Sequence, residues 1–305
     1  MRVTTTMLAD QALAALRAGL ARLARSQAHL ATGRRLEVPS DDPAAHAVAT
    51  RLGARLAATE QFQRQALRAR ETLAATDTLV DGLLTLLGRA EELAVAGANG
   101  TLSAADRAAM AVEVDQLLEE VVALANTADA DRYLLGGRET TAAPLTVTRD
   151  ASGRIIAATW NPRGVDGAID LEIADGTAVQ TNLGGTAVLG ADTDPAFLPA
   201  VLVQLRDALS GNDQAAVNAR LGPLETARAR LVGARGTLGS RLQRVDAVLA
   251  ELDTTRLAAQ TALSAVVDAD IGRLAVELAQ QEAVYRAALH AAARTVQPSL
   301  LEFLR

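Results

Sequence analysis

The chain contains no cysteine and no lysine among its 305 residues, so all thirty basic residues are arginine. Without cysteine it has no thiol nucleophile, disulfide, iron–sulfur cluster or cysteine-ligated zinc. Without lysine it has no Schiff-base lysine and no phosphate-binding lysine of the Walker or kinase type. The composition therefore excludes several large classes of enzyme, and a chain without thiols tolerates oxidising surroundings.

Histidine and aromatic residues are also scarce. The three histidines, His29, His46 and His290, have no metal-binding spacing on one helix face. Aromatic residues make up 2% of the chain although 50% of it is hydrophobic, so the apolar half is mostly alanine and leucine. This composition favours long helices that pack closely through small side chains. We expect no metal ion, no cofactor and no catalysis.

The N-terminal segment lacks a cleavable signal peptide, because Asp10 and Arg17 interrupt the stretch where such a signal needs an unbroken apolar core. No apolar run is long enough for a membrane span. The net charge is −6, yet the first 35 residues are basic. Arg17, Arg25, Arg34 and Arg35 therefore leave open a helix that binds a membrane surface or nucleic acid, although aromatic stacking residues are missing there.

Each end of the chain carries an apolar stripe with alternating steps of three and four residues, which is typical of a helix that packs lengthwise on another helix. Two interpretations remain open: an antiparallel pair within one chain, or a surface that is completed only by other copies of the chain. The predicted assembly seam comprises Leu13, Leu16, Leu20, Leu23 and Leu30 with Ile271, Leu274, Leu278, Tyr285 and Leu289.

The terminal helices are bounded by recognisable start and stop residues. Gly33 is suited to the end of the first helix, and Asp42 to the N-cap of the next, with Pro43 at its first position. At the other end, Asp268 and Asp270 break one helix and cap the last. Neighbouring acidic residues can form metal or acid–base sites, but no further ligand is identifiable here, so capping is the better interpretation.

The period of the pattern changes in the middle of the chain. A helical pattern runs to the Asn-Gly turn at 99–100 and resumes after Ser103, where Asp106 completes a capping box. Short alternating segments between 144 and 189 predict β-hairpins, and helical spacing returns from about 199. The pair Gly184-Gly185 predicts a turn, because no nucleotide-binding glycine pattern and no following helix are recognisable.

These patterns predict a mainly α fold with a small β insertion, in which the N- and C-terminal segments form a long antiparallel helical bundle or coiled-coil rod. We expect three parts: a terminal helical assembly domain, a helical rod domain and a small β-rich insertion domain. Their boundaries are 1–43 with 268–305, 44–140 with 205–267, and 141–204, respectively.

Several long motifs, in the right order, resemble those of the bacterial flagellin family. They are ELAVAGANGT at 92–101, DR at 106–107, LLEE at 117–120, ANT at 125–127, TGRR at 32–35, PSDDP at 39–43, VDADI at 267–271 and LAQQE at 278–282. Further segments resemble the family member that joins hook to filament: MRVTT at 1–5, DRYLLGG at 131–137, VQTN at 179–182 and PSLLEFL at 298–304. A short filament flagellin is the alternative within the family.

The resemblance implies a non-enzymatic subunit of the extracellular flagellum, exported through the flagellar type III apparatus without cleavage of a signal peptide. It implies a ring of identical copies at the hook–filament junction. It also implies three partners: hook-associated protein 1 on the proximal side, flagellin on the distal side, and an export chaperone that covers the C-terminal stripe before secretion.

Overall fold

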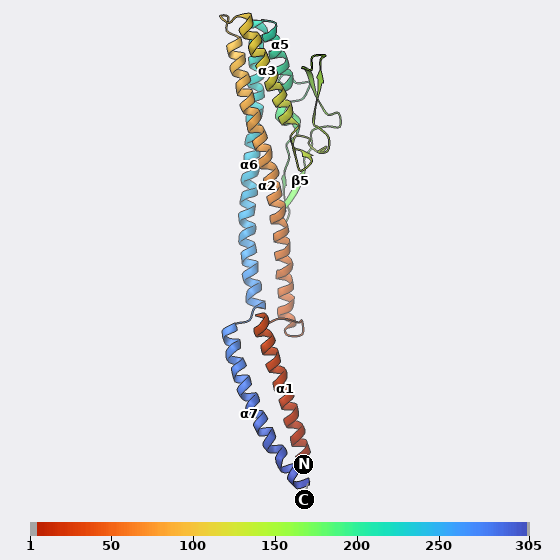
Figure 1. The fold of residues 1–305 in the computed structure, drawn as a ribbon, viewed down its shortest axis with the longest axis vertical. Coiled ribbons are helices and arrows are strands. Elements are labelled where there is room, and N and C mark those ends of the chain that lie inside the picture. Colours follow the sequence, from red (N-terminus) through yellow and green to blue (C-terminus); the bar gives the residue numbers. More distant parts are fainter. Residues whose placement is uncertain (1–4, 304–305) are drawn as a thin grey trace. The chain divides into compact units, whose positions relative to one another are not determined.

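The computed structural model describes the backbone of residues 5–303; the motifs at 1–5 and 298–304 therefore extend outside the described residues (Figure 1). Long helices dominate this range, as the sequence predicts, and three two-stranded antiparallel sheets accompany them. The helices are α1 (Thr5–Thr32), α2 (Pro43–Gly97), α3 (Ala104–Ala125), α4 (Gly185–Leu189), α5 (Leu198–Ser210), α6 (Gln214–Val267) and α7 (Ile271–Phe303). The strands are β1 (Ala128–Asp129), β2 (Arg132–Tyr133), β3 (Leu145–Arg149), β4 (Ile155–Trp160), β5 (Asp170–Ala174) and β6 (Thr177–Gln180).

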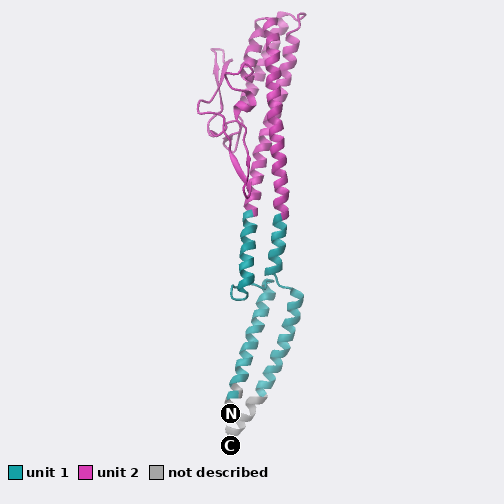
Figure 2. Ribbon diagram, turned by 180° about the vertical axis from the view of Figure 1, so that it is seen from behind, with its two compact units in different colours: residues 1–58, 255–305 teal, residues 59–254 magenta. Residues whose placement is uncertain are grey.

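Contacts divide the chain into two compact units (Figure 2). Unit 1 comprises Met1–Ala58 and Thr255–Arg305, and unit 2 comprises Thr59–Thr254. Each unit joins segments from both halves of the sequence, because α2 and α6 run through both of them. The division into an assembly domain, a rod domain and an insertion domain stays a prediction.

Arginine–carboxylate pairs connect α2 to the antiparallel α6 in unit 2. Arg228 Nε lies 3.2 Å from Glu91 Oε2, and Arg235 Nη1 lies 2.5 Å from Asp81 Oδ1. Both arginine side chains are almost half exposed, so these ion pairs lie at the solvent-exposed edge of the interface between the two helices. Partial burial raises the pKa of Glu91, and the Arg228 charge opposes that shift.

The α2–α3 hairpin ends as the sequence predicts. Ser103 caps α3: its side chain accepts a hydrogen bond from the Asp106 amide, while the Asp106 carboxylate accepts one from the Ser103 amide. The Ser103 hydrogen bonds hold the pKa of Asp106 below its ordinary value. This capping box satisfies amides at the helix start that would otherwise lack partners.

The β insertion is held against the helices by the chain's one tryptophan and its neighbours. Trp160 pairs with Leu145 across the β3–β4 hairpin, and its ring lies 5.6 Å, centroid to centroid, from that of Phe197. Trp160 Nε1 donates to the Gly190 carbonyl oxygen at 2.8 Å, so the indole is both packed and hydrogen-bonded. These contacts make the insertion part of the core of unit 2, which extends through α2, α3, α5 and α6.

Two short elements in and before the insertion differ from the sequence prediction. A short helix, α4, follows Gly184, so the prediction of a turn at 184–185 without a helix was wrong. The helix spans only five residues before Gly190, at φ 94°, ends it, which is too short for its period to be recognised. The hairpin β1–β2 was missed for a similar reason, because each strand has two residues.

Gly185 leaves room for the tryptophan ring, and we predict that Gly185→Ala destabilises unit 2. A Cβ atom at this position would lie 2.7 Å from Trp160 Cη2, closer than packed atoms approach. Because the ring is fixed by Phe197 and Gly190, we expect a loss of about 1–3 kcal/mol of unfolding free energy. Urea unfolding followed by Trp160 fluorescence measures it. Gly239→Ala is the control: an added Cβ atom has open space at this position on α6, so the variant should keep its stability. Gly153→Ala is less suitable, because the φ of 88° at Gly153 strains a residue with a Cβ atom.

A candidate assembly surface on the terminal helices

The two segments that flank the terminal helices are tied together by backbone hydrogen bonds. Gly33, at φ 68°, ends α1, and its carbonyl oxygen accepts a hydrogen bond from the Ala269 amide at 2.9 Å. The Arg35 amide donates to Val267 O at 2.7 Å, and its guanidinium donates to Val266 O at 2.9 Å. The positive φ at Gly33 explains why glycine suits this position. The link thus holds the end of α1 beside the start of α7.

Acidic side chains organise both sides of this link. Asp41 Oδ2 accepts hydrogen bonds from the Val38 and Glu37 amides, which hold the pKa of Asp41 below its ordinary value. Asp42 Oδ1 accepts from the Ala45 amide at 3.0 Å, the geometry of an N-cap, with Pro43 as the first residue of α2.

The corresponding acids at the C-terminal side have similar contacts. Asp268 Oδ2 accepts a hydrogen bond from Ser264 Oγ at 2.5 Å, and Asp270 Oδ1 accepts one from the Arg273 amide at 3.1 Å. Asp268 therefore follows the end of α6, and Asp270 caps the start of α7. No cluster of three metal-ligating side chains occurs among the residues that the structure describes.

Small and polar residues lie where α1 and the antiparallel α7 meet. Ser26 is buried, and its Oγ donates to Gln281 Oε1 at 3.0 Å. One heptad earlier, a Cβ atom added at Gly19 would lie 3.3 Å from Tyr285 Cδ2. Small side chains therefore allow the longer ones of α7 to approach α1. Neither Gly19 nor Ser26 was predicted from the apolar stripe, although small residues recur every seven positions at Ala12, Gly19 and Ser26.

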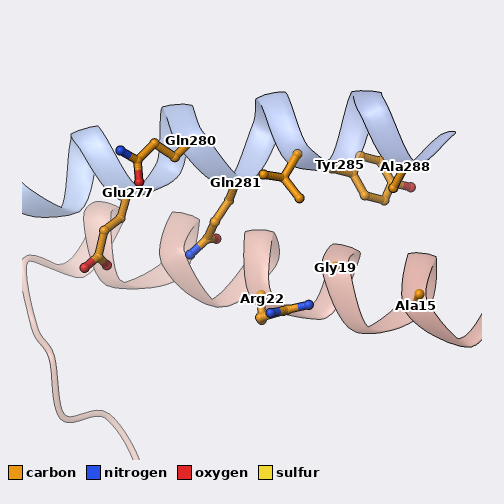
Figure 3. Close-up of a pocket in the computed structure, with 9 residues that line it drawn as sticks. Ala15, Gly19, Arg22, Glu277, Gln280, Gln281, Tyr285 and Ala288 are labelled. Atoms are coloured by element: carbon orange, nitrogen blue, oxygen red, sulfur yellow. The ribbon is translucent and has the colours of Figure 1, made fainter. Parts of the chain in front are cut away.

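A groove of about 380 Å³ lies along this helix pair (Figure 3). Gln281 points from α7 toward α1, and the groove continues past Tyr285 (Figure 3). Its lining combines Ala15, Gly19 and Arg22 of α1 with Glu277, Gln280, Gln281, Val284, Tyr285 and Ala288 of α7. Val284, which is 68% exposed, forms an apolar edge of the groove.

The ten predicted seam residues fall into two groups. Six are only partly exposed: Leu16, Leu23, Leu30, Leu274, Leu278 and Tyr285. Four are exposed: Leu13 and Leu20 at 47% and 52%, and Ile271 and Leu289 at 49% and 43%. Leu13 and Leu20 are two helical turns apart, and Ile271 and Leu289 are five turns apart, so each exposed pair shares one side of its helix. We call these four residues the outer stripe.

Unit 1 buries few side chains for its length. Among its described residues only Ser26, Leu36 and Ala259 are buried, whereas unit 2 has a continuous core of leucine, valine and aromatic side chains. Ordering the backbone costs about 1–2 kcal/mol per residue, and burial of apolar area is the main term that offsets it. The terminal helix pair therefore has little core of its own.

The chain is similar to known flagellar proteins. Residues 3–140 match the family described as the bacterial flagellin N-terminal helical region. Flagellar hook-associated protein 3 of Salmonella typhimurium is 30% identical over 145 residues, which are 47% of this chain and 46% of that protein. The chain thus matches less than half the length of that relative. Flagellin FlaB1 of Treponema pallidum is 26% identical over 280 residues, 90% of each chain.

A solved structure shares the fold. A flagellar hook-associated protein from Vibrio parahaemolyticus superposes with a TM-score of 0.66 at 22% sequence identity, covering 74% of this chain and 99% of that one. This likeness shows a shared fold of long helices, and the N-terminal part of the chain, residues 3–140, is similar to the bacterial flagellin family. Flagellar hook-associated protein 3 of Escherichia coli is likewise similar, at 28% identity over 200 residues, which are 60% of this chain and 63% of that protein.

Proposed function

We propose that this protein is a structural subunit of the bacterial flagellum that joins the hook to the filament. It acts without catalysis, through self-assembly of its terminal helices into a ring. The observation that carries the assembly role is the exposure of the outer stripe, Leu13, Leu20, Ile271 and Leu289, in a unit with few buried residues. Apolar side chains aligned on one side of each helix favour burial against another helix.

The likeness to hook-associated protein 3 supports the junction position over the filament. In this proposal the proximal partner is hook-associated protein 1 and the distal partner is flagellin. An export chaperone covers the C-terminal stripe before the chain leaves the cell. The subunit then works outside the cell, after export without cleavage of a signal peptide. Among the described residues, no helix has the length and hydropathy that crossing a bilayer requires.

In this proposal each of the three predicted domains has its own role. Residues 1–43 and 268–305 form the assembly domain, 44–140 and 205–267 form the rod domain that makes lateral contacts, and 141–204 form the insertion. In the assembly domain, the six partly exposed seam residues pack within one chain, and the outer stripe packs between copies. Gly33 and the capping residues Asp42, Asp268 and Asp270 keep the two terminal helices in register for that contact.

A short filament flagellin is the second candidate, because the Treponema flagellin aligns with 90% of the chain. The third, a basic helix that binds membrane or nucleic acid, has less support. Arg35 is one of the four arginines proposed to bind phosphates, but its guanidinium donates a hydrogen bond to Val266 O and its amide donates one to Val267 O.

A deletion strain tests the junction role. Without this gene, we expect hooks to form normally while flagellin escapes unpolymerised into the medium, because the filament lacks its attachment surface. Electron microscopy of the hooks and immunoblots of the medium measure the two outcomes. Loss of the filament protein itself, with no flagellin in cells or medium, contradicts the junction role and supports the filament role. Complementation with the intact gene is the control.

A further inference from the structure

The turn between α2 and α3 carries a reactive dipeptide. Asn99 is the one asparagine of the sequence that precedes a glycine, and both Asn99 and Gly100 are exposed. Asn99 Oδ1 accepts hydrogen bonds from the Thr101 amide at 3.2 Å and from Thr101 Oγ1 at 3.0 Å. These two donors hold the Asn99 side chain over the turn and withdraw electron density from its Cγ atom.

The Gly100 nitrogen is available as an internal nucleophile. Within the described part of the chain, its N–H donates no hydrogen bond, unlike the neighbouring amides of Asn99 and Leu102. Glycine has no Cβ atom to hinder an approach to the preceding side chain. The exposed position also gives water access to the turn.

We propose that Asn99 is a site of spontaneous deamidation. The Gly100 nitrogen forms a bond to Asn99 Cγ, the bond from Cγ to Nδ2 breaks, and ammonia leaves with the proton that the Gly100 nitrogen gives up. Water then adds to one of the two carbonyl carbons of the cyclic imide and opens it, to aspartate or to isoaspartate. Water is the only co-reactant, and no atom is oxidised or reduced.

Hydrogen bonds protect two other asparagines of the same unit, Asn126 and Asn182, from this reaction. Asn126 is tied in both directions to Leu145, since its Nδ2 donates to Leu145 O and its Oδ1 accepts from the Leu145 amide, each at 2.9 Å. Asn182 is buried, and its Nδ2 donates to the Gly167 carbonyl oxygen at 2.8 Å. Neither precedes a glycine. They serve as internal references within one digest.

The two products have different structural consequences. The carbonyl oxygen of Asn99 accepts a hydrogen bond from Arg107 Nη2 at 2.8 Å, and the buried Arg107 also donates to Gly97 O and Asn212 Oδ1. Aspartate leaves the backbone path unchanged and keeps these contacts. Isoaspartate adds one carbon to the main chain and displaces the carbonyl oxygen from Arg107, so this product loosens the turn.

Incubation of the full folded chain in mildly alkaline buffer tests the proposal. Trypsin, which cleaves here only at arginine, releases the peptide 90–107 with Asn99 as its one asparagine. We expect this peptide to gain one mass unit with time and to accept methyl groups from an isoaspartyl methyltransferase. Peptides with Asn126 and Asn182 should stay unchanged over the same period. Equal rates at all three sites would overturn the proposal.

Gly100→Ala is the matched variant. A Cβ atom at Gly100 would lie 3.5 Å from Gln214 Oε1, an ordinary contact, so the variant should fold, as Trp160 fluorescence can verify. The added methyl group hinders the attack, and we expect roughly tenfold slower conversion. Conversion at the rate of the unsubstituted chain would also overturn the proposal. Asn99→Asp should unfold at the same temperature as the fresh protein, whereas the fraction enriched in isoaspartate should unfold at a lower one.

Discussion

The double substitution Leu13→Glu with Leu20→Glu should abolish attachment of the filament while leaving the folded subunit intact. Both leucines are about half exposed in the solitary chain, so their replacement removes only part of the burial that a core leucine provides. In an assembly that buries the exposed half of each side chain, each leucine contributes about 0.8–1.5 kcal/mol. Losing two such contributions lowers the association constant by roughly 10- to 10²-fold, and burying the new charges lowers it further.

Expression of the variant in the deletion strain measures this effect through motility and through flagellin in the medium. Ala21→Glu is the matched control, because Ala21 is exposed on α1 and lies about 100° around the helix from Leu20. It should support normal filaments. Normal filaments with the double variant would show that the outer stripe is not an assembly surface. Urea unfolding of both variants, followed at Trp160, checks that unit 2 remains folded.

Arg206→Ala should destabilise unit 2 by about 3–5 kcal/mol. The side chain of Arg206 is only 2% exposed. Its Nη1 atom lies 2.7 Å from Asp115 Oδ1 and donates to Ile155 O at 2.6 Å, which joins α5 to α3 and β4. Burial by itself lowers the pKa of Arg206, but the hydrogen bonds of Arg206 to Asp115 and Asp207 keep this pKa above its ordinary value. Removing the guanidinium leaves Asp115 and Ile155 O without this partner.

The urea midpoint of Trp160 fluorescence measures the loss. Arg70→Ala is the control, because Arg70 and Asp246 form a pair in which both side chains are more than half exposed. Such a pair contributes less than about 1 kcal/mol, so this variant should unfold near the midpoint of the unsubstituted chain. A loss below about 1 kcal/mol for Arg206→Ala would contradict a structural role for the network.

Local signals determined the ends of the helices. Ser103 with Asp106, Asp42 with Pro43, and Gly33 act through hydrogen bonds and dihedral angles that involve neighbouring residues, so the sequence contains most of what is needed to place them. The β-hairpins predicted between 144 and 189 are present as β3–β4 and β5–β6, and they could be predicted because alternation and turn residues are local signals. The pieces too short to have a period, α4 and β1–β2, were not predicted.

The sequence by itself determined the helical class, the two apolar stripes and the absence of thiol and lysine chemistry. Only the tertiary structure decided which seam residues pack against the partner helix and which remain exposed. Leu16 and Leu20 belong to the same three-four pattern, yet Leu16 is partly covered and Leu20 is exposed. The contacts of Gly19 with Tyr285 and of Ser26 with Gln281 determine which side of α1 faces α7. The periodicity of the sequence indicates which side chains are apolar. It does not indicate which of them are covered, because the covering helix comes from a segment more than two hundred residues away.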